Sequence, residues 1–286
     1  MIQRTLGRTG LRVSAISFGA GPVSGLMTGD DRDLQHATVK RAIDAGINWF
    51  DTAAGYGNGK SEANLGRVLE ELGAKERVYV ATKVRIPADA FTDVAGYVNR
   101  SVEESLSRLG LSRVPLLQLH NGITRERGDE PASVAVADVL GPRGIVEAFR
   151  ELRAAGLVEH FGLTGTGQPD AIRQVIASGE FETIQTPFNI LNPSAGQTDA
   201  AAGDSDYGNI FGDCAARGIG VFAIRVFAGG ALLNQPPSAH TLRTPFFPLS
   251  LYERDLERAR RVRERLPKGT SMAEAAVQFA LGHPAV

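Results

Sequence analysis

Cysteine is almost absent from this sequence, because its 286 residues include one, Cys214. A single cysteine excludes an intrachain disulfide and fits a reducing compartment, so the cytoplasm is the expected location. Long apolar runs are also missing. No stretch approaches the roughly 18 to 20 apolar residues of a membrane helix, and the N-terminal segment has no signal-peptide core. We therefore expect a soluble protein that is not embedded in a membrane.

An excess of charge of one sign is missing as well. Lys and Arg number 31 and Asp and Glu number 32, a net charge of -1, which gives no electrostatic argument for nucleic acid or an anionic membrane. The arginine-rich stretch 258–268 is better explained as the solvated face of a helix, with Glu257 able to pair with Arg261. Its expected buried side is Leu251, Ala259, Val262 and Leu266. The balance of charge favours a small-molecule partner.

Metal-binding spacing is absent too. The histidines outside the motifs below are scattered along the chain, at His36, His160, His240 and His283. None has the spacing of a zinc site, and we expect no bound metal.

What the sequence does contain is a repeated unit. Stretches of helical periodicity end in glycine, and each is followed within a few residues by a β-rich apolar run. Glycine just past a helix end provides the left-handed cap that such an end requires. The glycines are Gly46, Gly73, Gly110, Gly156, Gly179 and Gly218. With "RVSAISFG" at 12–19 as the first strand, the pattern predicts parallel strands alternating with helices.

The alternation favours a (β/α)8 TIM barrel of about 250 residues, with an N-terminal β-hairpin in "TLGRTGLRVS". An open doubly wound sheet is the alternative, but no G-x-G-x-x-G fingerprint follows the first strand. Two connections, 121–142 and 227–250, follow strand C-termini and are unusually long, so we assign them to substrate or cofactor enclosure. Variable loops without function are the simpler alternative. No linker divides the chain, which predicts one barrel domain over 1–286.

Ionisable residues end three neighbouring strands of this pattern. Asp51 follows "INWF", Lys83 ends "RVYVATK" and His120 ends "VPLLQLH". Singly, these could be a turn cap, an exposed lysine and a satisfied core histidine. Because the C-terminal ends of parallel strands meet at one mouth, we expect the three to converge there.

Tyr56 lies in the small-residue loop after Asp51. A phenol is a poor acid at neutral pH, but a buried ammonium beside it would stabilise the phenolate. Lys83 can be that ammonium, and Asp51 would be its counter-charge. His120 could hydrogen-bond the oxygen of a bound carbonyl.

These motifs together resemble the aldo-keto reductases. "INWFDTAAGYGNGKSEANLG", "VYVATKV" and "LLQLHN" are similar to that family's patterns around its catalytic Asp, Tyr, Lys and His, in the same order. The resemblance implies hydride transfer between NADP(H) and a small aldehyde, ketone or sugar carbonyl. It implies that Tyr56 is the general acid, that Lys83 and Asp51 tune it, and that His120 positions the carbonyl.

The resemblance also implies a cofactor site, with some departures. Gln185 matches a family glutamine of strand six that holds the nicotinamide carboxamide, Thr164 stands where Ser is usual, and Gly165 stands where Asn is common. "AIRVFAGG" departs at Ile224 and Arg225 from the family's aromatic and Ser. Arg225 could contact the cofactor phosphates or form an internal ion pair. The expected cofactor residues are Thr164, Gln185, Arg225, Phe227, Gly229 and Gly230.

The family pattern continues beyond "FALGHPAV" with an eighth strand and a last helix that binds the 2′-phosphate. We therefore expect the chain shown to be C-terminally incomplete. Two other functions stay open. One is a non-catalytic cofactor-sensing protein on the same barrel, as the related potassium-channel β-subunits suggest. The other is a Schiff-base lyase using Lys83, against which the nearby Asp51 argues.

Overall fold

Seven strands form one parallel sheet in the computed structural model, which describes residues 1–198, 204–243 and 249–286. They are β3 (Phe18–Gly19), β4 (Trp49–Asp51), β5 (Tyr79–Val84), β6 (Val114–Leu119), β9 (Val158–Thr164), β10 (Thr183–Pro187) and β11 (Gly220–Ile224). Each strand pairs with the next one of this set along the chain. This uninterrupted order is that of a curled (β/α) barrel, and it lacks the order reversal of a doubly wound sheet.

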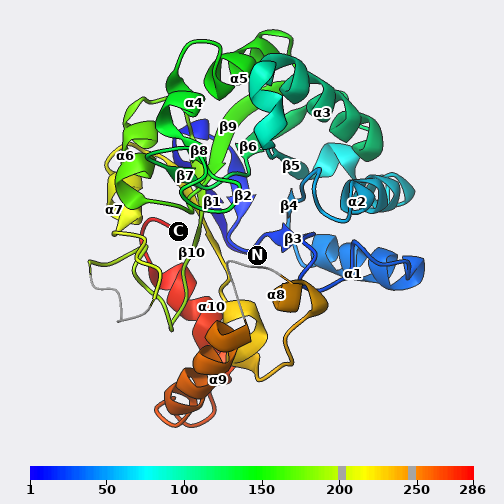
Figure 1. Cartoon of the computed structure of the whole chain (residues 1–286). Coiled ribbons are helices and arrows are strands. Elements are labelled where there is room, and N and C mark those ends of the chain that lie inside the picture. The colour runs from blue at the N-terminus through cyan, green and yellow to red at the C-terminus, as the bar shows by residue number, and fades with distance from the viewer. Residues whose placement is uncertain (199–203, 244–248) are drawn as a thin grey trace.

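Helices connect successive strands and cover the outer face of the sheet (Figure 1). They are α1 (Arg32–Asp44), α2 (Lys60–Glu71), α3 (Val94–Leu109), α5 (Ile145–Ala154), α6 (Pro169–Ala177) and α7 (Ile210–Ala215). One further turn of 3₁₀ helix, η2 (Lys75–Arg77), precedes β5, and another, η3 (Ala88–Thr92), precedes α3. The buried side chains of the helices form a large apolar layer against the strands.

The glycines that were expected to end helices all have positive φ, which confirms their role. Their φ angles run from 57° at Gly73 to 87° at Gly46. An L-residue with a side chain is strained in this region, whereas glycine is not. Each of these glycines therefore stops its helix and directs the chain into the following strand.

The expected first strand, 12–19, is wrong as a single element. Arg12–Ser14 forms β2, which pairs antiparallel with β1 (Gln3–Thr5) around the 3₁₀ turn η1 (Gly7–Thr9). This confirms the N-terminal hairpin and leaves Phe18–Gly19 to join the parallel sheet. The split is caused mainly by a residue far along the chain. Asn48 Oδ1 accepts from Ser14 N at 2.7 Å, and Ser14 Oγ donates to Ile16 O at 2.7 Å, which turns the chain between the two short strands.

The hairpin supplies the bottom of the barrel interior. Leu6 and Val13 pack with Trp49, Ala81 and Leu116 in an apolar cluster, and Trp49 lies against Phe222 at 5.1 Å between ring centroids. Nearer the strand C-termini, the interior side chains become polar. On β6, for example, Gln118 follows Leu116 on the same face of the strand. The barrel interior is therefore apolar at the hairpin end and polar at the C-terminal ends of the strands.

The two long connections carry short elements of their own. Residues 121–142 hold the parallel pair β7 (Ile123–Thr124) and β8 (Val134–Ala135) and the short helix α4 (Val136–Leu140). Buried Asn121 anchors this segment. Its Oδ1 accepts from Ile86 N, and its Nδ2 donates to Ile86 O and, at 2.8 Å, to Ala132 O. Residues 227–250 hold the 3₁₀ segment η4 (Ala228–Leu233) and α8 (Ala239–Arg243), and 244–248 lie outside the described residues.

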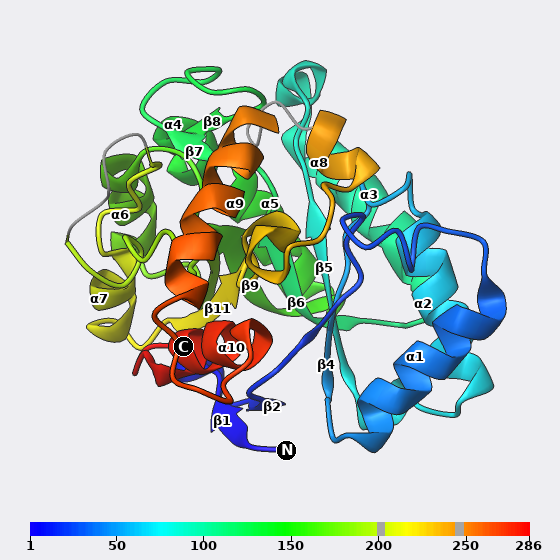
Figure 2. The same ribbon diagram turned by 90° about the horizontal axis from the view of Figure 1, so that it is seen from below.

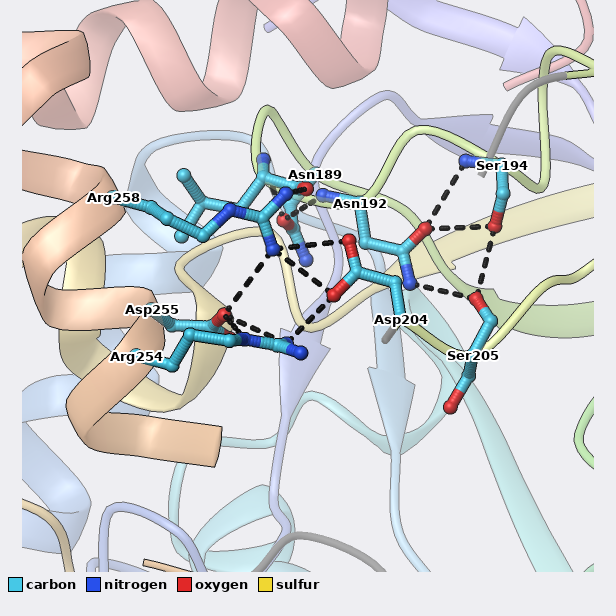
Figure 3. Close-up of polar contacts among 9 residues, drawn as sticks. Asn189, Asn192, Ser194, Asp204, Ser205, Arg254, Asp255 and Arg258 are labelled. Atoms are coloured by element: carbon cyan, nitrogen blue, oxygen red, sulfur yellow. Dashed lines mark hydrogen bonds and ion pairs between the residues drawn. The ribbon is translucent and has the colours of Figure 1, made fainter. Parts of the chain in front are cut away.

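The arginine-rich stretch belongs to α9 (Leu249–Arg263), which packs with η4 and α10 (Met272–Gly282) (Figure 2). The expected side faces this cluster, with Ala259 fully buried, and Glu257 pairs with Arg261 at 3.4 Å. Two arginines of α9 turn inward. Arg254 and Arg258 hold buried Asp204 at 2.7 and 2.9 Å (Figure 3). Arg258 also donates to Leu191 O. These arginines fix α9 to the loop after β10.

Within the parts of the chain that the structure describes, no helix has both the length and the apolar character needed to cross a membrane.

Candidate functional site

Asp51, Tyr56, Lys83 and His120, here called the tetrad, meet at the C-terminal ends of β4, β5 and β6. Asp51 is the last residue of β4, Lys83 is the last but one of β5, and His120 follows β6 directly. Parallel pairing sets these ends level, because Asp51 lies opposite Ala81 and Lys83 lies opposite Gln118. The structure therefore brings together all four of the candidate residues identified from the sequence.

Lys83 is the centre of the tetrad. Its Nζ forms an ion pair with Asp51 Oδ1, donates to Thr52 O at 2.8 Å and lies 3.2 Å from Tyr56 Oη. Its side chain is 1% exposed, and that of Asp51 is 13% exposed. Burial by itself lowers the pKa of Lys83, but the negative charge of Asp51 and the hydrogen bonds to Asp51 and Tyr56 outweigh it and raise the pKa above its ordinary value. The lysine is therefore a cation at neutral pH.

The loop that carries Tyr56 has a defined backbone path. Gly57, Asn58 and Gly59 have φ of 60°, 53° and 83°, a run that residues with larger side chains rarely adopt. The amide of Ser61 closes the loop by donating to Tyr56 O at 3.2 Å. The small residues after the tyrosine therefore serve this left-handed path, which turns the chain from the mouth of the barrel into α2.

His120 completes the mouth on the other side of Tyr56. The two rings meet edge to face, with 5.5 Å between centroids and 80° between planes. Burial is the largest cause that lowers the pKa of His120 well below its ordinary value, and the positive charges of Lys83 and Arg85 add to it. The imidazole is therefore neutral at pH 7, with one N–H to donate and one nitrogen to accept.

Two glutamines also contact the tetrad. Gln185 Nε2 on β10 and Gln118 Nε2 on β6 both donate to Asp51 Oδ2, at 2.6 and 2.9 Å. Sequence reasoning expected Gln185 at the cofactor and missed Gln118 altogether. The signal was available, because Gln118 is a polar residue inside the apolar run "VPLLQLH" and faces the same side as the interior Leu116.

A buried polar contact fixes α2 behind the site. Glu62 accepts from Thr82 Oγ1 on β5 and from Arg108 Nε on α3, the latter at 2.7 Å. Next to it, Ser61 Oγ donates to Ala20 O at 2.8 Å and lies 2.9 Å from Thr52 Oγ1. The first turn of α2 is thereby tied to the strands that carry Asp51 and Lys83, which sets where the Tyr56 loop ends.

Thr164 and Gln185 lie opposite each other in the β9–β10 register. Thr164 Oγ1 is buried and has no hydrogen-bond partner among the described residues. Buried polar atoms normally find partners, so an unpaired hydroxyl beside Gln185 fits a site for a polar group such as a carboxamide. Gln185, the other residue expected at the nicotinamide, donates its Nε2 to Asp51.

The other expected cofactor residues follow β11. Gly229 and Gly230 have φ of 68° and 103°, and Arg225 has φ of 56°. Burial lowers the pKa of Arg225, while Tyr207 and Asp255 act in the opposite direction. Phe227 lines a cavity of about 770 Å³ between β11, the hairpin and α10, to which the tetrad does not contribute.

The described ranges contain no group of three or more His, Cys, Asp or Glu side chains placed to hold an ion.

Comparison with known proteins gives the same family as the motifs. The family model "Aldo/keto reductase family" matches residues 15–286. The chain is 31% identical over 239 residues to the L-galactose dehydrogenase of Arabidopsis thaliana, covering 83% of this chain and 69% of that protein. It is 29% identical over 254 residues to a D-threo-aldose 1-dehydrogenase of a Pseudomonas species, covering 80% and 70%.

A solved structure supports the fold. The holo form of an aldo-keto reductase from Bacillus halodurans superposes with a TM-score of 0.73 at 24% identity, over 100% of this chain and 84% of that one. Together with the family model, these matches establish that the chain belongs to the aldo/keto reductase family of oxidoreductases.

Proposed function

We propose that this chain transfers hydride between NADP(H) and a small-molecule carbonyl, with Tyr56 as the general acid. The observation that carries the proposal is the position of Lys83 Nζ, ion-paired with Asp51 and 3.2 Å from Tyr56 Oη. There the ammonium can stabilise the negative charge that develops on the Tyr56 oxygen while the phenol donates its proton.

Tyr56 would donate its proton to the carbonyl oxygen as negative charge develops there, and in the oxidation direction it would take the proton back from the alcohol. Lys83 keeps its charge throughout, because its pKa is raised, and Asp51 holds it in place. His120 is neutral and lies beside the Tyr56 ring. It would donate its N–H to the same carbonyl oxygen and so orient it without competing for the proton.

The cofactor supplies the hydride when bound, passing from NADPH to NADP⁺. Thr164 and Gln185 would hold its carboxamide, which gives the unpaired Thr164 hydroxyl a partner. Gly229 and Gly230 would allow close backbone approach to the pyrophosphate, with Arg225 and Phe227 beside them. The preference for NADP over NAD rests on the family resemblance.

The substrate we propose is an aldehyde, ketone or sugar carbonyl, or the corresponding alcohol in the reverse direction. The names of two relatives, L-galactose dehydrogenase and D-threo-aldose 1-dehydrogenase, support a sugar.

The test is titration of the wild-type chain with NADPH and NADH, followed by turnover on a panel of aldehydes, ketones and aldoses. Tyr56→Phe should lose carbonyl reduction and keep cofactor binding. Tight cofactor binding with no turnover on any carbonyl by the wild type would favour a cofactor-sensing protein instead. Borohydride trapping of a carbonyl on Lys83 would favour a Schiff-base lyase.

A further inference from the structure

The two oxygens of Asp51 have different partners. Oδ1 is ion-paired with Lys83, while Oδ2 accepts from the amides of Gln118 and Gln185. A carboxylate with hydrogen-bond donors on both oxygens is stabilised in its charged form. The amides are neutral and donate to Oδ2, so they do not replace Lys83 as the counter-ion of Asp51.

Gln118 and Gln185 reach Asp51 from different places. Gln118 is 0% exposed and lies two residues before His120. It follows Leu116 of the apolar cluster at the hairpin end of the barrel. Gln185 is 5% exposed and lies at the mouth beside Thr164. Gln118 is thus enclosed within the barrel, whereas Gln185 is within reach of whatever binds at the mouth.

The carboxylate has a geometric need for Gln118. Asp51 is the last residue of β4, and the backbone pairing of the strand does not by itself select the side-chain rotamer that points the carboxylate at Lys83. Without a donor from β6, Oδ2 would depend on Gln185, whose amide is also expected at the nicotinamide. A second amide from within the barrel removes that dependence, because it holds Asp51 whether or not Gln185 is engaged elsewhere.

We propose that Gln118 is a positioning residue of the reaction, which holds Asp51 against Lys83 from inside the barrel, while Gln185 couples the cofactor site to the same carboxylate. This inference rests on the proposed function, because it acts through the tetrad on Tyr56. The Oε1 atom of Gln118 has no partner in the described part of the chain. The orientation of the amide is therefore set by its donation to Asp51.

A merely structural amide predicts different behaviour. If Gln118 only filled the barrel, an apolar side chain of similar size would leave kcat and its pH profile unchanged and alter the melting temperature alone. If Gln118 positions Asp51, the same change would weaken the hold on the Asp51–Lys83 pair, and the loss would appear in kcat.

The experiment compares Gln118→Leu, Gln118→Glu and Gln185→Leu with the wild-type chain, using NADPH and one carbonyl that the wild type reduces. Gln174→Leu, at an exposed position on α6, is the matched control. Gln118→Leu should lower kcat by about tenfold, the effect of losing one hydrogen bond to a charged group. Its Kd for NADPH should stay within about twofold, whereas Gln185→Leu should raise that Kd.

Gln118→Glu supplies a signature that packing cannot produce. Two carboxyl groups at this distance share a proton, and the protonated form can still donate to Asp51 Oδ2. Activity of this variant should therefore approach that of the wild type at low pH and fall as pH rises and the shared proton is lost. This profile also carries the test if Gln118→Leu fails to fold.

Wild-type kcat and an unchanged pH profile in both Gln118 variants would overturn the inference and leave the proposed function standing. Absence of NADPH binding and turnover in the wild type would instead overturn the proposed function, and the inference with it.

Discussion

Lys83 and Tyr56 face each other across the mouth of the barrel, with 3.2 Å between Nζ and Oη and the ammonium 4.8 Å from the centre of the phenol ring. The tyrosine comes from a loop and the lysine from a strand, so their approach depends on every contact that holds the loop, the strand and the counter-charge.

Lys83→Met should abolish most activity and also destabilise the protein. Loss of the ammonium removes the charge that stabilises the phenolate, which should lower kcat by about 10² to 10⁴ with little change in the Kd for NADPH. It also leaves the largely buried carboxylate of Asp51 without its cation, at a cost of about 3 kcal/mol in the free energy of unfolding.

A double-mutant cycle with Asp51→Asn checks the stability part by denaturant unfolding. The loss in free energy of unfolding for the double variant should be smaller than the sum of the two single losses, because no unpaired charge is then left. Simple additivity would contradict the pairing.

Acid should destabilise the folded protein through His120. The pKa of His120 in the folded state lies well below 6.5, its ordinary value, so between these values the unfolded chain binds the extra proton and the folded chain does not. The stability contribution is fully present above pH 6.5 and is lost as pH falls toward the folded pKa, by up to about 1.4 kcal/mol per pH unit. Urea unfolding between pH 7.5 and 5.5 measures it.

His120→Asn is the comparison, because asparagine does not titrate there. The wild type should lose more stability than this variant over the same range. Parallel pH dependences for the two proteins would show that His120 is not buried in its neutral form.

Glu62→Ala should destabilise the protein more than an exposed change of the same kind. Glu62 is 0% exposed and serves both Thr82 and Arg108, so its loss leaves a buried hydroxyl and a guanidinium without their acceptor, at about 2 to 4 kcal/mol. Glu71→Ala, which breaks the exposed Arg67–Glu71 pair on the same helix, is the control and should change little. Equal melting temperatures for the two variants would contradict the role given to Glu62.

Cys214 should resist thiol reagents in the folded state. Burial raises the pKa of Cys214 to about 12, and the charge of Asp213 adds to it, so neither the thiolate nor access to it is available at neutral pH. A chromogenic disulfide reagent should report no free thiol in native buffer and one thiol per chain in guanidinium. Rapid labelling of the native chain would mean that α7 opens readily.

The convergence of three tetrad residues could be predicted from the sequence because their chemical types stand out at strand ends. Asp51, Lys83 and His120 needed nothing more than strand order to be placed together. The six helix-ending glycines were equally predictable, since positive φ is a local property of the backbone. Both predictions depend on local sequence, so they can be made without knowing how distant segments pack.

The errors and omissions came from contacts between distant segments. The strand expected at 12–19 breaks because Asn48, more than thirty residues later, bonds Ser14. Gln118 was missed because its partner is on another strand, and Gln185 was assigned to the cofactor with no sign that Asp51 shares it. No local pattern in the sequence reports which interior amide meets which carboxylate across a barrel.

The central claim is that Tyr56 supplies the proton to a carbonyl reduced with NADPH, and one comparison tests it most directly. Wild type and Tyr56→Phe are titrated with NADPH and then assayed on the carbonyl that the wild type reduces best. We expect equal Kd for NADPH and a kcat at least about 10² lower in the variant, the scale of a lost general acid. A Tyr56→Phe enzyme with wild-type kcat would contradict the assignment.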